Sequence, residues 1–163
     1  MTGTYPDNFR SGRPRMELKD VVLKIARTAS DLLVRDGMVH PVAFLLDPDG
    51  EMNGCIALDF SSPKAKELSI DLARTAARKS SMVLAYVTEA WMSRDPRSEV
   101  APSQAPDREE VLIIAAFSPH SVAGALVRFS RDPDGNPVPS QPELIDHRLE
   151  SWMDPWPDRQ PAH

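Results

Sequence analysis

The sequence predicts an α+β domain, and three observations lead to that prediction. Two segments repeat apolar residues at the period of a helix, and five shorter segments are apolar or alternate at the period of a strand. Their order along the chain is helix, strand, strand, helix, strand, strand, strand. Short connections join the strands of each group, so we expect a mostly antiparallel five-stranded sheet with both helices on one face.

Proline divides the chain into ordered and irregular intervals. The 163 residues include 16 prolines, yet none lies within 15–40 or 64–95, and seven lie from Pro133 onward. Because proline disrupts helix interiors and central strands, the proline-free intervals should hold regular structure. We therefore expect three parts: a flexible N-terminal segment over 1–14, a single α+β domain over 15–132 and a proline-rich tail over 133–163.

The first helix and the first strand are predicted from apolar spacing. Leu18 and Ile25 belong to an apolar stripe at helical spacing over 17–36. Gly37 follows directly and suits the left-handed conformation that often ends a helix. The next run, 42–46, is apolar on both faces, which is typical of a central strand.

A tight turn then leads into the second strand. The sequence Asp-Pro-Asp-Gly at 47–50 has the residues that a β-turn needs, and residues 51–60 form the strand. Asn53 and Gly54 indicate a bulge within it. Cys55, the single cysteine, lies in this strand, and we expect it to be a buried small hydrophobic residue.

The second helix begins at Pro63 and extends to Lys79. Ser62 supplies a hydroxyl cap, and proline is favoured at the first helical position. Many of the apolar residues in this helix are alanines, which suits close packing on a sheet. We expect the buried stripe to contain Leu68, Leu72, Ala73, Ala76 and Ala77.

Three more strands complete the domain. Residues 82–92 alternate, and residues 109–118 and 122–131 contain strongly apolar runs. The first two strands are separated by a long polar loop over 93–108 that contains three prolines. The last strand ends in a second Asp-Pro-Asp-Gly turn at 132–135.

The element order resembles that of profilin-like and roadblock-like domains, which implies a fold but no function. Two helices on one face would leave the other face of the apolar sheet uncovered. Either the tail covers it, with Trp152 and Trp156 as anchors, or a second subunit does. Since an exposed apolar patch of that size is unusual in a monomer, we expect a homodimer.

Net charge and apolar content bear on whether the protein binds nucleic acid, spans a membrane or is secreted. The formal net charge is −5, and the basic residues do not cluster, so we expect no nucleic-acid partner. No run of about 18 apolar residues exists, so we expect no membrane span. The N-terminus has no signal-peptide pattern, and we expect a cytoplasmic protein.

Familiar catalytic and metal-binding motifs are missing from the sequence. The histidines have no zinc-binding spacing, and no nucleophile elbow or glycine-rich phosphate loop occurs. We therefore assign no catalytic residue, no metal ligand and no cofactor.

The densest polar cluster flanks the 93–108 loop. If the two flanking strands pair, Glu89 lies within about 10 Å of a glutamate at the start of the second strand. Such carboxylates could bind a divalent cation or act as an acid and a base. The alternative is a solvated strand end in which Arg108 or Arg128 forms an ion pair with Glu89. The candidate residues are Glu89, Trp91, Asp107, Arg108, Glu109 and Glu110.

Two sequence blocks in this hairpin form a pattern. Glu-Ala-Trp-Met at 89–92 precedes the polar loop, and Pro-Ser-Gln-Ala-Pro-Asp-Arg-Glu-Glu at 102–110 ends it. The pattern, over 82–117, resembles a hairpin shared by a loose group of small uncharacterised bacterial and phage-borne proteins. That group has no assigned activity, so the resemblance implies no mechanism and marks the hairpin as the place to look.

The sequence favours a non-catalytic interaction or regulatory module that acts as a dimer. The alternative is a small divalent-metal-dependent hydrolase or ligand-binding protein that uses Glu89 and the carboxylates of 107–110. A deep pocket walled by Trp91 would favour the enzyme, and a flat apolar surface there would favour the module.

Overall fold

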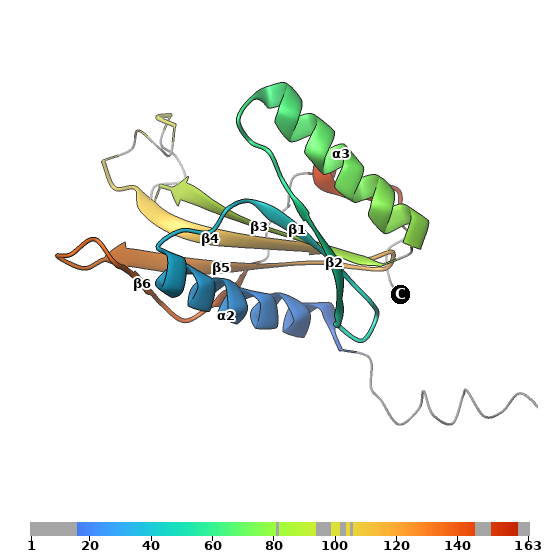
Figure 1. The fold of residues 1–163 in the computed structure, drawn as a ribbon, viewed down its shortest axis with the longest axis horizontal. Coiled ribbons are helices and arrows are strands. Elements are labelled where there is room, and N and C mark those ends of the chain that lie inside the picture. The colour runs from blue at the N-terminus through green and yellow to red at the C-terminus, as the bar shows by residue number, and fades with distance from the viewer. Residues whose placement is uncertain are drawn as a thin grey trace, which may run out of the picture.

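The computed structural model describes residues 16–80, 82–93, 99–101, 104, 106–145 and 151–159. Within these residues, two long helices pack on a seven-stranded antiparallel sheet (Figure 1). The α+β class is confirmed, with seven strands in place of the predicted five. The predicted N-terminal segment and half of the predicted 93–108 loop lie outside the described residues.

The elements follow the predicted order and then continue past it. The sheet order is β2-β1-β3-β4-β5-β6, and β7 also pairs with β5. Every pairing is antiparallel. The bounds are α2 Leu18–Asp36, β1 Val42–Leu46, β2 Met52–Ala57, α3 Pro63–Ser80, β3 Val83–Met92, β4 Glu109–Phe117, β5 Val122–Arg131, β6 Pro137–Pro139, β7 Glu143–Ile145 and the 3-10 turn η2 Ser151–Met153.

Helix α2 buries the predicted stripe and ends where the sequence indicates. Val22, Ala26 and Leu33 on that stripe are fully buried against the sheet. Gly37 adopts φ 81°, and its N–H donates to the Leu33 carbonyl over 2.8 Å. Glycine takes this left-handed conformation without the Cβ clash that other residues meet, so the predicted helix end is confirmed.

The two Asp-Pro-Asp-Gly turns have the same hydrogen bonds. In the first turn, Asp47 Oδ1 accepts from the backbone N–H groups of Asp49 and Glu51. Asp132 does the same in the second turn. The closing glycines, Gly50 and Gly135, have φ 84° and 85°. Each turn precedes a strand at an edge of the sheet.

Strand β1 is central and β2 is irregular, as predicted. β1 lies between β2 and β3. The register shifts between Leu45, which pairs with Gly54, and Leu46, which pairs with Met52. Asn53 is therefore the extra residue of the expected bulge.

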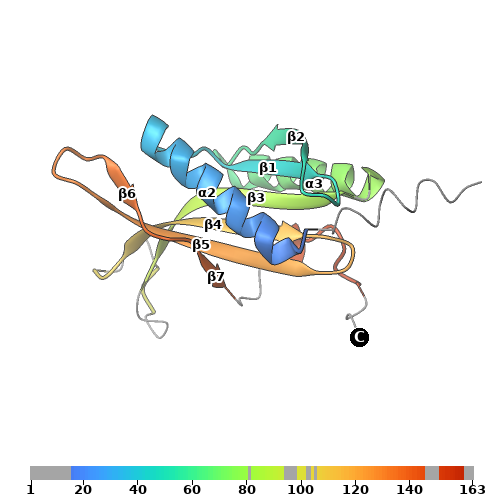
Figure 2. The ribbon, with the colours of Figure 1, turned by 90° about the horizontal axis from the view of Figure 1, so that it is seen from below.

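The two helices lie on opposite faces of the sheet, so the prediction of both on one face is wrong (Figures 1 and 2). Ala85 and Val87 of β3 belong to the core under α2, whereas Leu84 and Tyr86 belong to the core under α3. β2 and β3 are both antiparallel to β1, so α3 is a crossover between parallel strands. Such crossovers keep one hand, which confines α3 to one face and leaves the other to α2.

Helix α3 starts as predicted and buries part of the predicted stripe: Ala73 and Ala77 are buried, whereas the two leucines are not. The Ala65 N–H donates to the Ser62 Oγ over 3.1 Å, which confirms the cap. Leu68 and Leu72, expected in the core, are 60% and 59% exposed. The buried residues are Ile70, Ala73 and Ala77. Two alanines on this face let the helix backbone approach the sheet closely, and that contact decided its rotation.

The C-terminal tail is part of the domain. β6 and β7 extend the sheet beyond β5, and Met153 and Trp156 pack against the core under α3. The Tyr86 hydroxyl donates to the Met153 carbonyl over 2.8 Å. Of the two predicted anchors, Trp156 contacts the core, whereas Trp152 is 41% exposed. The apolar face that suggested a second subunit is therefore covered by α3 and the tail.

Candidate functional site

The predicted hairpin forms, but its register places the candidate carboxylates on both faces of the sheet. Trp91 pairs with Glu110, and Met92 pairs with Glu109. Successive side chains of a strand point to opposite faces. Glu89 and Glu110 therefore lie on the face that α2 covers, and Glu109 lies on the other.

Glu89 anchors a connection between two elements. Its Oε1 accepts a hydrogen bond from the backbone N–H of Val39, in the segment between α2 and β1. Val39 is only 8% exposed, and a buried amide without a partner would destabilise this segment. The predicted ion pairs of Glu89 with Arg108 or Arg128 are wrong. Glu89 accepts from the Val39 N–H instead, while Arg108 lies over the Trp91 ring and Arg128 pairs with Glu109 and Glu143.

Glu110 forms a forked ion pair with Arg131 of β5. Arg131 Nε lies 2.9 Å from one carboxylate oxygen, and Nη2 lies 3.3 Å from the other. Arg131 also donates to the Gly135 carbonyl and stacks over the Phe129 ring. The hydrogen bond to Glu110 raises the pKa of Arg131, and the nearby charge of Glu89 raises it further.

Glu109 is paired on the opposite face. Arg128 of β5 forms ion pairs with Glu109 and, at 3.0 Å, with Glu143 of β7. The hydrogen bond to Glu143 raises the pKa of Arg128, and Glu109 adds to the effect. This arginine thus ties β4 to β7 across β5.

The remaining candidates also contact each other. The Arg108 guanidinium lies 4.8 Å from the centre of the Trp91 ring, a cation–π contact. The Ser93 hydroxyl donates to Asp107 over 3.2 Å. Among the described residues, no group of three or more His, Cys, Asp or Glu side chains is placed to hold a metal ion. In this structure Glu109 and Glu110 join strands, and Glu89 joins β3 to the segment between α2 and β1.

Two other features, which the sequence reasoning missed, lie at the opposite side of the sheet. The first is the outer edge of β2, which no strand among the described residues pairs with. Between Met52 and Ala57 this strand has no proline and no charged residue. Met52 is 56% exposed, and Cys55, expected to be buried, is exposed as well. Cys55 is on the α2 face of the sheet, but β2 lies beyond the part that α2 covers.

The hydrogen bonds of β2 alternate between the two sides of the strand. The Leu58 N–H donates to the Pro41 carbonyl, so Leu58 and every second residue before it face β1. The N–H and C=O groups of Cys55 and Ala57 consequently point outward. They are the backbone groups of β2 that a further strand would bond.

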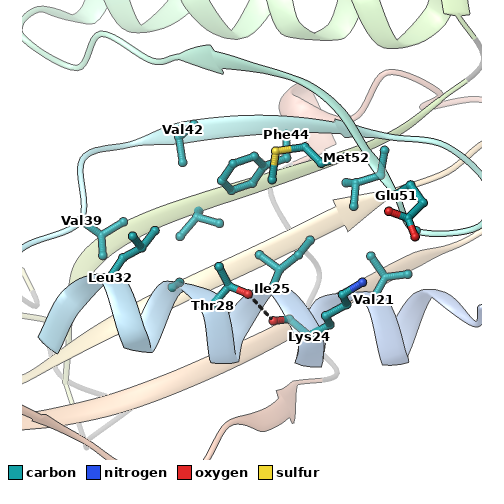
Figure 3. Close-up of a pocket in the computed structure, with 14 residues that line it drawn as sticks. Val21, Lys24, Ile25, Thr28, Leu32, Val39, Val42, Phe44, Glu51 and Met52 are labelled. Atoms are coloured by element: carbon teal, nitrogen blue, oxygen red, sulfur yellow. Dashed lines mark hydrogen bonds between the residues drawn. The ribbon is translucent and has the colours of Figure 1, made fainter. Parts of the chain in front are cut away.

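The second missed feature is a cavity of about 210 Å³ between α2 and β1 (Figure 3). It begins beside the first turn, near Gly50 and Met52, and reaches Val39 at the other end. Many of the hydrophobic residues that line it belong to the predicted helix stripe over 17–36 and the predicted strand over 42–46. Their spacing carries no signal that a space remains between them.

Comparisons with protein-family models, with curated proteins and with solved structures found no match in any of the three. The resemblance of the hairpin to the group of bacterial and phage-borne proteins, and of the element order to profilin-like domains, thus stays a prediction. Among the described residues no helix has both the length and the apolar character to cross a membrane.

Proposed function

We propose that the protein is a non-catalytic interaction module that acts as a homodimer, in which the β2 strands of two copies pair. The observation that carries this proposal is the uncharged, unprotected edge of β2. A free edge offers a row of unpaired backbone groups to another strand, and proteins usually protect such edges with charge, proline or a cover. The bulge at Asn53 protects only the start of β2.

The paired carboxylates support this proposal over the metal-dependent alternative. Glu89, Glu109 and Glu110 each hold another part of the fold. A metal site or an acid–base pair in the hairpin would require them to leave these partners. The cost of unpairing partly buried charges favours the arrangement in place.

An antiparallel pair of β2 strands is geometrically simple. The outward groups of Cys55 and Ala57 supply the hydrogen bonds around a two-fold axis near the middle of the strand. The side chains of Cys55 from the two copies then lie at most about 8 Å apart, as for directly or diagonally opposed residues. The exposed side chains of Met52 and Ala57 become covered.

Acidic residues flank the paired segment and set its salt dependence. Glu51 precedes β2 and Asp59 follows it, so the antiparallel arrangement places Glu51 of one copy near Asp59 of the other. Hydrogen bonds from Ser61 lower the pKa of Asp59, which keeps this carboxyl charged at neutral pH. Because salt screens repulsion between exposed charges, the dimer should tighten as ionic strength rises.

Sedimentation velocity at micromolar concentration tests the proposal. We expect a dimer for the native chain and a monomer for Ala57→Lys, since the two-fold would bring the new ammonium groups together. Val138→Lys is the matched control on the opposite edge, where Val138 is 50% exposed, and it should remain a dimer. A native chain that sediments as a monomer at every salt concentration would overturn the proposal.

Cross-linking through the single cysteine locates the interface. A short bismaleimide, which spans about 8 Å, should join two copies through Cys55 in high yield. A dimer that shows no cross-link would mean that another surface joins the copies. That result would contradict the role of β2.

A further inference from the structure

The cavity lies at the edge of the core, between α2 and β1. α2 covers β4 and β5, and its outer side faces β1 and the start of β2 without filling the space between (Figure 3). Ile25 and Leu32 line the helix side, and Val42, Phe44 and Met52 line the strand side. A volume of about 210 Å³ exceeds that of an apolar cavity known to hold one benzene ring, about 150 Å³.

The side chains deep in the cavity are hydrophobic and supply no hydrogen-bonding group for water. Apart from Lys24, Thr28 and Glu51, the residues that line it carry hydrophobic side chains or, at Gly50, none. Thr28 Oγ1 already donates to the Lys24 carbonyl. A water molecule is retained in a cavity when two to four polar partners surround it. An apolar group is therefore the favoured occupant.

The rim carries one charge of each sign. Lys24 on α2 and Glu51 beside β2 both lie at the mouth, and both side chains are exposed (Figure 3). In the part of the chain that the structure describes, neither forms an ion pair with another residue. A ligand with a single charge would meet attraction from one and repulsion from the other. A zwitterionic head group would be attracted by both.

We propose that this cavity binds a compact apolar molecule with a zwitterionic head, the chemistry of a free aromatic or branched-chain amino acid. The ring or branched chain occupies the space between Ile25, Val42 and Phe44. The carboxylate lies toward Lys24 and the ammonium toward Glu51. The site shares Glu51 and Met52 with the β2 edge, but its apolar interior is lined by α2 and β1 and does not require the proposed dimer.

Titration with L-phenylalanine and its two singly charged analogues tests the proposal. Amide resonances of residues that line the cavity should shift in ¹⁵N–¹H NMR spectra. Phenylalanine should bind about fivefold more tightly than phenethylamine or 3-phenylpropionate, since each exposed ion pair contributes modestly. No shift with millimolar phenylalanine would overturn the site. Equal binding of all three probes would overturn the head-group assignment.

Two variants test where in the cavity the ligand binds and which rim residue its head group contacts. Val42→Phe fills the cavity and should abolish the shifts, whereas the same substitution at the exposed Val138 of β6 should leave them intact. Lys24→Ala leaves the interior unchanged and should remove the preference for phenylalanine over phenethylamine. Binding that persists in folded Val42→Phe would contradict the location, and a preference that persists in Lys24→Ala would contradict the role of the rim.

Discussion

The two edges of the sheet begin alike and end differently. Each edge strand follows an Asp-Pro-Asp-Gly turn with the same hydrogen bonds and the same positive φ at its glycine. β6 is three residues long, and two of them, Pro137 and Pro139, have no N–H to offer. β2 has six residues and no proline.

The two edges also differ in the path of the chain beyond each strand. After β6, the chain adds β7 to the same side of β5 and then returns over the α3 face, where Asp154 and Arg159 hold it. After β2, the chain leaves through α3 and nothing in the described residues pairs with the outer side of the strand. The same turn thus precedes two different edges. The β6 edge is short and rich in proline, and we call it the closed edge. The β2 edge is longer, has no proline and is the open edge.

The anchor of the closed edge should have the largest effect on stability. Asp154 is 6% exposed, and Arg159 donates both to its carboxylate and to the Ser118 carbonyl. Asp154→Ala leaves a mostly buried guanidinium without its counter-charge, which should lower the free energy of unfolding by about 3–5 kcal/mol. Urea denaturation measures this, with the exposed Asp158→Ala expected within about 0.5 kcal/mol of the native chain. Similar values for the two variants would mean that the tail is not anchored here.

The contact of the tail with β3 should have the next largest effect. Tyr86→Phe removes the donor to the Met153 carbonyl and should cost about 1–3 kcal/mol. Burial raises the pKa of the Tyr86 hydroxyl well above its usual range. The stabilisation it brings is therefore complete below about pH 10, the value for unfolded chains, and is lost as the pH rises further. Above pH 10 the native chain should lose stability faster than Tyr86→Phe, and equal slopes would contradict the contact.

The twin turns permit a smaller, matched comparison. Gly135→Ala should cost about 1 kcal/mol, because alanine is strained at positive φ while no atom lies within 4 Å of the added Cβ. At Gly50 the added Cβ would lie 3.0 Å from the sulfur of Met16. Gly50→Ala should therefore lower the free energy of unfolding by a few tenths of a kcal/mol more than Gly135→Ala does, as measured by thermal unfolding. A smaller cost at Gly50 would show that Met16 does not pack on the first turn.

A substitution beside the open edge should change the free energy of unfolding only slightly but change the dissociation constant of the dimer measurably. Asp59→Asn keeps the oxygen that accepts the Ser61 N–H but removes a charge that faces Glu51 of the second copy. We expect the dimer to tighten by about two- to tenfold, because the two-fold axis makes two such like-charge contacts across the strands and the substitution removes both. Asp134→Asn, in the turn before β6, is the control and should leave the dissociation constant unchanged. Weaker association of Asp59→Asn would argue against the antiparallel arrangement.

Local rules predicted most of the secondary structure. The α2 stripe, the Gly37 end, the Ser62 cap, both turns and the Asn53 bulge each depend on neighbouring residues. The rotation of α3 did not follow from such rules. The predicted stripe held Leu68 and Leu72 beside Ala73 and Ala77, and the structure buries the two alanines but not the leucines, because small side chains permit close packing on the sheet.

The candidate site was predicted less well, because side chains choose partners that are distant in sequence. The pairing of the 89–92 and 107–110 segments was expected, and the register confirms it. The hydrogen bond between Glu89 and Val39 spans 50 residues, and no pattern in either segment indicates it. Cys55 was expected to be buried because cysteine within a strand usually behaves as a small buried hydrophobic residue, and only the sheet order made it an edge residue.

Spacing, caps and turn residues act within a few positions, so they were enough to predict the two helices, the first five strands and the two Asp-Pro-Asp-Gly turns, but not β6 and β7. The face that α3 covers, the strands that the tail adds beside β5 and the cavity that α2 leaves became visible only in the folded chain. These outcomes depend on how elements far apart in the chain pack together. The two proposals depend on the open edge of β2 and on the cavity, which are the places where the described elements leave one side of a strand unpaired or a space unfilled.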